Sequence, residues 1–360
     1  MASAVAPLPE RSMTGPAEIE APLKGLVRSV LGDGDYSVFY DLLPILAQDV
    51  ADSEDRLKAS LPASYPFLEE AASYATDSGG KRVRPLLISA VYRALGATET
   101  SKIQPLAAAF QLIHTATLVH DDVIDRADLR RGKPSVPRAF GMPAAIVAGD
   151  YLFVRAFQLA ARYSPEVILR CGEACAELAQ GEMMQENSRY DLTLGRDRYL
   201  RIMSMKTASI VAAGVASSAM VSGAAREVVD GLEEYGRGVG VAFQIQDDLL
   251  DVYGDPDVTG KPLFSDWKEG MPTLLSLDAH AALDGKERSE FERLFLARRK
   301  RPAELLRLKE LTDRTDAHAR SMADAEKWVE SAIHGLRKLP EGPYRQLLEQ
   351  VARGVITRRF

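Results

Sequence analysis

Two acidic clusters of the same form lie far apart in this chain, each within an otherwise apolar stretch of helical character. They read Asp121-Asp122-Val123-Ile124-Asp125 and Asp247-Asp248-Leu249-Leu250-Asp251. Because residues i and i+4 of an α-helix share a face, each cluster directs two carboxylates the same way. Carboxylates in apolar surroundings are costly unless they are paired or bind a metal, and Mg²⁺ takes oxygen ligands that include substrate phosphates. The chain is therefore expected to bring two helices face to face around a metal-bound diphosphate.

One acidic cluster alone could equally be a solvated helix face or a helix start. The residues before both clusters are apolar, aromatic or amide, whereas a solvated face would alternate with Lys or Glu. The second copy, in the same kind of surroundings, favours a functional site.

Helical periodicity covers most of the chain, and alternating strand patterns are scarce. The expected helices span 105–120, 143–163, 165–186, 197–222 and 225–253, with three or more after Met271. This pattern predicts an all-α fold, a single-domain many-helix bundle with a central active-site cavity between facing helices. No Gly/Ser/Pro-rich linker divides residues 30–360. We therefore expect one domain over residues 25–360, preceded by a disordered N-terminal tail over residues 1–24 that is rich in Ala, Pro, Ser and Glu.

Composition limits the partners and the compartment. The formal net charge of −6 argues against a nucleic-acid surface, which needs an excess of Lys and Arg. Cys171 and Cys175 are too close along one helix for an ordinary disulfide, and we expect buried thiols in a reducing cytoplasm. The uncharged run 207–225 is long enough to span a bilayer, but it consists of Ala, Ser, Gly and Val. We expect a buried central helix there and no membrane span.

Basic residues occur where a second phosphate group would need them. Gly79-Gly80-Lys81-Arg82-Val83-Arg84-Pro85 places three cations beside flexible glycines, and Arg130-Arg131-Gly132-Lys133 follows the first acidic cluster. Arg binds phosphate oxygens in bidentate fashion. Each run by itself could be a solvated loop, and Lys206 and Lys261 are isolated cations.

Taken together, these segments closely resemble the trans-isoprenyl diphosphate synthase (polyprenyl synthetase) family, from about Tyr65 to the C-terminus. They occur in the family's order: GGKRVRP at 79–85, HTATLVHDDVIDRADLRRGKP at 114–134, GEMMQ at 181–185, KTAS at 206–209, FQIQDDLLD at 243–251 and GDPDVTGKP at 254–262. The resemblance implies an all-α prenyltransferase, usually a homodimer, that joins isopentenyl diphosphate to an allylic diphosphate with three Mg²⁺ ions per active site.

The resemblance also implies a role for each matching residue. Asp121 and Asp125 would bind two Mg²⁺ ions and Asp247 a third, with Asp122, Asp248 and Asp251 behind them or on metal-bound water. Cations on the departing diphosphate would be Arg130, Lys206 and Lys261. The isopentenyl diphosphate would be held by Lys81, Arg84, His114 and Arg131. Polar groups beside the reacting carbons would be Thr207 and Gln244. The released pyrophosphate would accept the final proton, while His120 is a rival base or, as we prefer, a second-shell or core residue.

Product length is expected to depend on the helix before the first acidic cluster. Steps of about one turn back from Asp121 lead to Thr117 and Ala116, then Ile113, then Phe110. In the family a bulky aromatic just before the cluster closes the pocket early. Ala116 and Thr117 are small here, so a medium- or long-chain polyprenyl product is favoured. Phe110 could act as a floor near geranylgeranyl length, which leaves a geranylgeranyl diphosphate synthase as the alternative.

One segment departs from the family pattern GKPxGxDxxxGKxT. Phe264 stands in place of a glycine and Met271 in place of a lysine, so one diphosphate cation is missing. Lys268, Arg358 or Arg359 could compensate. A terpene cyclase would need no second diphosphate clamp, a catalytically silent subunit would normally have lost one acidic cluster, and a helix-rich scaffold has no use for paired carboxylates. These three alternatives are less favoured.

Overall fold

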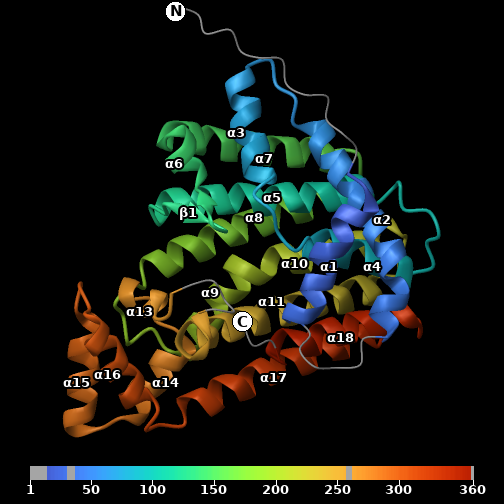
Figure 1. Ribbon diagram of the computed structural model, residues 1–360. Coiled ribbons are helices and arrows are strands. Elements are labelled where there is room, and N and C mark those ends of the chain that lie inside the picture. Colours follow the sequence, from blue (N-terminus) through green and yellow to red (C-terminus); the bar gives the residue numbers. More distant parts are fainter. Residues whose placement is uncertain (1–13, 31–36, 257–261, 358–360) are drawn as a thin grey trace, which may run out of the picture.

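The computed structural model describes residues 14–30, 37–256 and 262–357, and nearly all of its regular structure is helical (Figure 1). The helices are α1 (Pro16–Val30), α2 (Ser37–Ser60), α3 (Pro66–Thr76), α4 (Val83–Ala94), α5 (Gln104–Ile124), α6 (Val136–Phe140), α7 (Met142–Ala160), α8 (Pro165–Glu186), α9 (Arg196–Met203), the π-helical turn η1 (Ser204–Ala208), α10 (Ser209–Val221), α11 (Arg226–Tyr253), α13 (Ser265–Glu269), α14 (Leu274–Ala282), α15 (Gly285–Leu296), α16 (Pro302–Thr312), α17 (Ala317–Leu336) and α18 (Pro343–Thr357). Within the described ranges the only sheet is a hairpin of β1 (Leu129–Arg130) and β2 (Lys133–Pro134). The all-α prediction is confirmed.

The expected helices agree with the observed ones to within a few residues, apart from one interruption. The stretch expected as a helix over 197–222 is divided by η1 into α9 and α10. The π-helical turn carries Lys206 and Thr207, two of the residues expected at the active site. Lys261, Arg358 and Arg359 lie outside the described residues.

The predicted tail was too long. Helix α1 begins at Pro16, and its residues Ile19 and Leu23 belong to the same buried cluster as residues of α2. Removal of these apolar side chains from water favours an ordered helix over a free tail. The prediction of disorder up to residue 24 is therefore wrong for residues 16–24, and residues 1–13 lie outside the described part of the chain.

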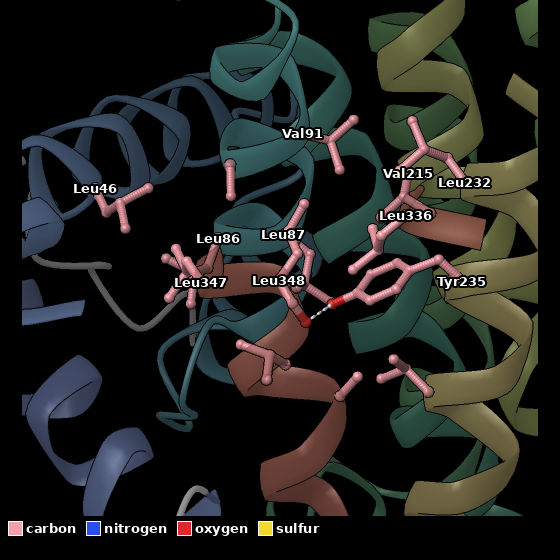
Figure 2. Close-up of a cluster of buried hydrophobic side chains, with 14 of the residues drawn as sticks. Leu46, Leu86, Leu87, Val91, Val215, Leu232, Tyr235, Leu336, Leu347 and Leu348 are labelled. Atoms are coloured by element: carbon pink, nitrogen blue, oxygen red, sulfur yellow. Dashed lines mark hydrogen bonds between the residues drawn. The ribbon is translucent and has the colours of Figure 1, made fainter. Parts of the chain in front are cut away.

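Helices α5, α8, α10 and α11 lie in the middle of the molecule, with α2 and α4 on one side and α13 to α16 on the other (Figure 1). One apolar cluster joins α2, α4, α10, α11, α17 and α18, as Figure 2 shows, and there the Tyr235 hydroxyl donates to the Leu348 carbonyl at 3.0 Å. A second cluster is built mainly on α5 and α7, and a third on α9, α11 and α13 to α16. The site described below lies on the helices that these clusters hold in place.

Helix α10 is buried, as expected from its mild all-round hydrophobicity. Among the described residues, the continuous helix Arg196–Val221 is the one stretch long and apolar enough to cross a bilayer, and 72% of its apolar window is buried inside the protein. Ser217 and Ser218 on α10 are fully buried, and Ser218 donates to the Ile88 carbonyl at 2.8 Å. A core helix accounts for this stretch.

Candidate active site

The first acidic cluster ends helix α5, and its three carboxylates have different surroundings. Asp122 is 2% exposed and faces the β1–β2 hairpin, where Arg130 Nε and Nη2 donate to its Oδ1 at 2.8 and 2.5 Å. Burial raises the pKa of Asp122, while the Arg130 guanidinium opposes that shift. Asp122 therefore positions Arg130, one of the cations expected on the diphosphate.

Asp121 faces α8 and η1. Burial raises its pKa to about 7; the Lys206 ammonium opposes this shift, and the carboxylates of Glu182 and Asp125 add to it. Asp125, the C-cap residue of α5, is more exposed. This face of α5 therefore carries more negative charge than its neighbours neutralise.

Two side chains of α8 hold Lys206 near this cluster. Its Nζ lies 2.6 Å from Glu182 Oε2 and donates to Gln185 Oε1 at 2.7 Å. Burial lowers the pKa of Lys206, but the carboxylates of Glu182 and Asp121 outweigh burial and raise it, so the ammonium form persists. The GEMMQ motif at 181–185 did not by itself indicate roles for Glu182 and Gln185. Their i, i+3 spacing on one helix face was the available signal.

Two glycines allow the η1 turn to lie between α8 and α11. A Cβ on Gly181 of α8 would lie 2.5 Å from the backbone nitrogen of Lys206. A Cβ on Gly240 of α11 would lie 2.5 Å from Ala208 Cα. Real Cβ atoms do not approach other atoms so closely, so any larger residue would push the helices apart. A π-helical turn within an α-helix redirects side chains and often marks a functional position. Here Lys206 points towards α5 and α8 while Thr207 points towards α11.

The second acidic cluster lies on α11, and a hydrogen-bonded chain links it to η1. Thr207 Oγ1 donates to Gln244 Oε1 at 3.1 Å, and Gln244 Nε2 donates to Asp248 Oδ1 at 2.9 Å. The Tyr199 hydroxyl of α9 donates to the other Asp248 oxygen at 2.5 Å. Burial raises the pKa of Asp248 to about 7, although the Tyr199 and Gln244 hydrogen bonds lower it and the charge of Asp247 raises it. Sequence analysis missed Tyr199, since nothing local connects it with α11.

Asp251, near the end of α11, contacts a second helix. Its Oδ1 accepts from the Ser265 backbone N–H at 3.0 Å and its Oδ2 from that of Asp266 at 3.1 Å, so it binds the start of α13. The Asp266 side chain is partly buried, and burial together with the charge of Asp248 raises its pKa well above the ordinary value. Asp266 thus adds a further carboxyl to the second cluster, and sequence analysis had assigned it no role.

The two departures from the family pattern have structural explanations. Phe264 has a left-handed backbone with φ of 64°, the conformation that favours glycine, and its ring stacks on Trp267 at 5.6 Å. Met271 is 8% exposed and packs in the core. Lys268 Nζ donates to the Leu263 carbonyl at 3.0 Å, which engages it in the loop before α13.

A group of cations lies on the opposite side of α5 and α4. Burial, followed by the charge of Arg131, lowers the pKa of Arg84 to about 10, and its Nε has no hydrogen-bond partner although it is buried. Burial and then Arg84 and Arg131 hold the pKa of His114 well below 6.5, so its imidazole is neutral. Arg131 donates to the Gly79 carbonyl. Cations that repel one another around an unpaired donor form a binding site for an anion.

Two residues of the basic segment 81–84 do not belong to this group in the same way. Arg82 lies 2.7 Å from the buried Glu54 and donates to the Thr76 carbonyl, so it ties α2 to the loop before α4. Lys81 is exposed. Three neighbouring cations in the sequence therefore have three different surroundings.

An apolar cavity of about 110 Å³ lies beside the cationic group. Arg84 and Thr207 both line it, and so does Phe243, which lies one residue before Gln244. The other lining residues are Phe39, Val83, Leu87, Val211, Val239, Gly240, Val351 and Val355. A hydrocarbon group could occupy this space while an anion attached to it contacts Arg84.

Similarity to known proteins agrees with this geometry. The family model for polyprenyl synthetase matches residues 65–312. The chain belongs to the polyprenyl synthetase family. It is 33% identical over 316 residues to octaprenyl diphosphate synthase from Escherichia coli, with 87% of this chain and 97% of the relative covered. As the family indicates, the protein is a prenyltransferase with the all-α isoprenoid synthase fold.

Solved structures of the family superimpose over most of the chain. Polyprenyl synthase from Caulobacter crescentus, complexed with calcium and isoprenyl diphosphate, matches with a TM-score of 0.83 and 33% identity over 90% of this chain and 98% of that one. Geranylgeranyl pyrophosphate synthetase from Pyrococcus horikoshii matches with a TM-score of 0.82 and 30% identity over 89% and 99%.

The donors present in this polyprenyl synthetase fit a hard divalent cation. The two clusters offer only carboxylate oxygens, and the raised pKa values of Asp121 and Asp248 reflect buried negative charge that a cation would relieve. Among the described residues, no three Asp, Glu, His or Cys side chains converge closely enough to hold a metal by themselves. Water and substrate phosphates would have to complete the shell, as is usual for Mg²⁺.

The residues expected to set product length all lie inside. Phe110, Ile113 and Ala116 are at most 1% exposed, and Thr117 is 8% exposed. Phe110 faces α10, where a Cβ on Gly214 would lie 3.5 Å from its ring. These four positions therefore form a buried row on α5 that leads away from Asp121, along the path expected for a growing prenyl chain.

His120 faces away from this path. Its Nε2 lies 3.2 Å from the Ile146 carbonyl and 3.6 Å from Asp150 Oδ1, both on α7, and its ring occupies the space that a Cβ on Gly149 would need. These contacts agree with the reading of His120 as a packed residue behind Asp121 rather than as a base.

Proposed function

We propose that this prenyltransferase condenses isopentenyl diphosphate with an allylic diphosphate, in a Mg²⁺-dependent reaction, to give an all-trans polyprenyl diphosphate. The observation that carries the proposal is the presence of two different kinds of anion site, one of which has an apolar cavity beside it. One site is lined by carboxylates that face Lys206, and the other by Arg84, His114 and Arg131. Two diphosphates that differ in how they are held require such an arrangement.

The acidic site suits the allylic diphosphate. Three bound Mg²⁺ ions, with Asp121, Asp125 and Asp247 as ligands, would neutralise the leaving group's charge. Lys206 adds a fixed ammonium beside Asp121, and Arg130 adds a guanidinium that Asp122 orients. Lys261 is proposed as a further cation on sequence grounds. Cleavage of the allylic C–O bond leaves both electrons on the diphosphate oxygen, where these cations stabilise them.

The cationic site suits isopentenyl diphosphate. Arg84 Nε is a buried donor without a hydrogen-bond partner. Neutral His114 can donate one hydrogen bond without adding charge. Lys81 and Arg131 are proposed to complete the clamp. The isopentenyl group would extend into the apolar cavity beside Phe243 and Thr207, which keeps water away from the allylic cation.

A new carbon–carbon bond forms when the isopentenyl double bond attacks the allylic cation, and one proton must then leave. His114 is a poor acceptor because its pKa is held far below neutrality. His120 is engaged on α7. We therefore propose that the released pyrophosphate takes the proton, with Thr207 and Gln244 orienting the reacting groups through their hydrogen bond.

A medium- or long-chain product is supported by the small Ala116 and Thr117 next to Asp121. The relative from Escherichia coli is named as an octaprenyl diphosphate synthase, although the relative from Pyrococcus horikoshii makes geranylgeranyl pyrophosphate by its name. Phe110 lies deeper on the same path, and a product that ends at this ring would be near geranylgeranyl length, which is the alternative.

The protein is further proposed to be a cytoplasmic homodimer. Apolar side chains on the outer faces of α7 and α8 are exposed, with Ile146 at 44%, Val147 at 53%, Val154 at 54% and Leu169 at 62%. A second copy would cover them. The small-residue run 208–225 is mostly buried within its own chain in α10, so it offers little surface for such a contact. On α7, Ala145 and Ala148 are buried as well.

The test is incubation of the purified protein with Mg²⁺, labelled isopentenyl diphosphate and either farnesyl or geranylgeranyl diphosphate, followed by chain-length analysis. A ladder that ends beyond geranylgeranyl supports the proposal, and a sharp stop at geranylgeranyl supports the shorter synthase. Cyclic hydrocarbon from the allylic substrate alone would indicate a cyclase. No consumption of isopentenyl diphosphate would contradict the proposed reaction.

A further inference from the structure

Arg189 lies between the two acidic regions, on the segment that joins α8 to α9. Its Nη2 is 3.3 Å from Asp125 Oδ1 at the end of α5, and its Nη1 is 3.2 Å from Glu269 Oε2 at the end of α13. Its Nε donates to both Glu186 oxygens at 2.9 Å, and Nη2 lies 2.6 Å from Glu186 Oε1. One guanidinium therefore contacts three carboxylates from three different parts of the chain.

The backbone around Arg189 is held in place. The Tyr190 N–H donates to the Gly270 carbonyl at 2.6 Å, and a Cβ on Gly270 would collide with the Tyr190 ring. The Arg298 guanidinium covers the Tyr190 ring at 3.9 Å from its centroid. Helix α13, which Glu269 and Gly270 terminate, begins at the carboxylate of Asp251. Arg189 is thereby fixed beside Asp125 of the first acidic cluster and is linked through α13 to Asp251 of the second.

We infer that Arg189 is an internal counter-cation of Asp125, from which a divalent metal must displace it. Asp125 Oδ1 is the atom that Arg189 contacts, and a carboxylate oxygen that accepts from a guanidinium has less negative charge available for a metal. Glu186 and Glu269 remain as partners when Asp125 is given up, so the displaced guanidinium stays paired. Arg189 is thus a positioning residue that lowers the metal affinity of the substrate-free protein.

This inference rests on the proposed function, because it takes Asp125 as a metal ligand. A purely structural role for Arg189 would affect stability and leave metal affinity unchanged, since α5, α8 and α13 have apolar contacts of their own. Metal affinity without substrate therefore separates the two roles. Mn²⁺ is a suitable probe, as it takes the same oxygen ligands as Mg²⁺ and can be counted directly.

The experiment measures Mn²⁺ binding to the substrate-free protein by electron paramagnetic resonance of the free ion, with calorimetry as a second readout. Arg189→Gln removes the charge, and Arg189→Lys keeps it. Arg226→Gln is the matched control, because it removes the same charge from an exposed i, i+4 pair with Asp230 at the start of α11. Melting temperatures of the metal-free variants establish that each one is folded. If Arg189→Gln does not fold, the lysine variant carries the test.

Arg189→Gln is expected to bind Mn²⁺ roughly three- to tenfold more tightly than the wild type, since one positive charge no longer opposes a divalent ion a few ångströms away. Arg226→Gln should match the wild type. The lysine variant should lie between, because one ammonium cannot contact three carboxylates.

Unchanged or weaker Mn²⁺ binding in Arg189→Gln, with normal binding in the wild type, overturns the inference and leaves the proposed function standing. Equal tightening in Arg226→Gln also overturns it, because general charge would then be the cause. A wild type that neither binds Mn²⁺ nor transfers prenyl groups overturns the proposed function together with this inference.

Discussion

Replacement of Phe110 by alanine is expected to lengthen the product. Phe110 is fully buried on α5, about three turns before Asp121, and its ring and Ile88 of α4 both lie beside Gly214 of α10. A prenyl chain that starts at the acidic cluster and grows along α5 would meet this ring end-on. Without the ring, the chain can extend further between α5 and α10.

The size of the change follows from the atoms removed. Phe110→Ala deletes the six ring carbons, while each condensation adds five carbons, so the space gained corresponds to about one further isoprene unit. The same deletion from a core costs about 3–5 kcal/mol of the free energy of unfolding when the cavity stays empty. A bound prenyl chain would fill the cavity and recover part of this loss, so the melting temperature of the variant should rise more with product than that of the wild type.

The assay is chain-length analysis of products from wild type and variant under identical conditions, together with thermal unfolding. Phe295→Ala is the matched control, since Phe295 is equally buried but packs in the third apolar cluster on α15. It should lose similar stability and keep the wild-type product. An unchanged product from folded Phe110→Ala would show that Phe110 is not the floor, and lengthening by Phe295→Ala would point to general loosening.

Three further predictions concern other parts of the site. Ala116→Phe should shorten the product by filling the path one turn before Asp121, and unchanged chain length would mean that this face of α5 points elsewhere. Gly181→Ala should lower the free energy of unfolding by about 1–3 kcal/mol and remove most of the activity, because its Cβ would lie 2.5 Å from the backbone nitrogen of Lys206. Gly172→Ala on the same helix meets nothing within 4 Å and should retain activity, so equal losses would refute the argument. In EDTA, Asp121 should contribute a loss of stability as the pH rises from about 4 to 7. The pKa of Asp121 is raised to about 7 in the folded state, so the folded protein binds more protons than the unfolded chain over this range. Asp121→Asn should reduce that slope, by on the order of 1 kcal/mol per pH unit, in urea unfolding at several pH values.

Much of the site could be anticipated because its residues occur in short local patterns. The i, i+4 spacing of the acidic residues requires only that the segments be helical, and α5 and α11 are helices. The pair Lys206-Thr207 was identified through resemblance, and its role in the reaction stays a prediction. Helix α8 begins and ends at the expected residues, 165 and 186, because Pro165 and the polar residues after Glu186 mark its limits.

Residues that act through neighbours distant in sequence could not be anticipated. Tyr199 contacts Asp248 across 49 residues, and Arg189 contacts Glu269 across 80. Arg82 looked like part of a phosphate clamp, yet it pairs with Glu54, which lies on a different helix. No spacing rule connects such partners, because they meet only after several helices have packed.

The sequence alone determined the helical class, the two acidic clusters and the family, since these depend on local periodicity and on the order of motifs along the chain. Tertiary structure decided how the charges are shared. In the folded protein Asp122 pairs with Arg130, Asp251 accepts hydrogen bonds from the start of α13, and Lys206 pairs with Glu182. The physical reason is that pairing energies and pKa values depend on distance and burial, which are set only when α5, α8, α11 and η1 pack together.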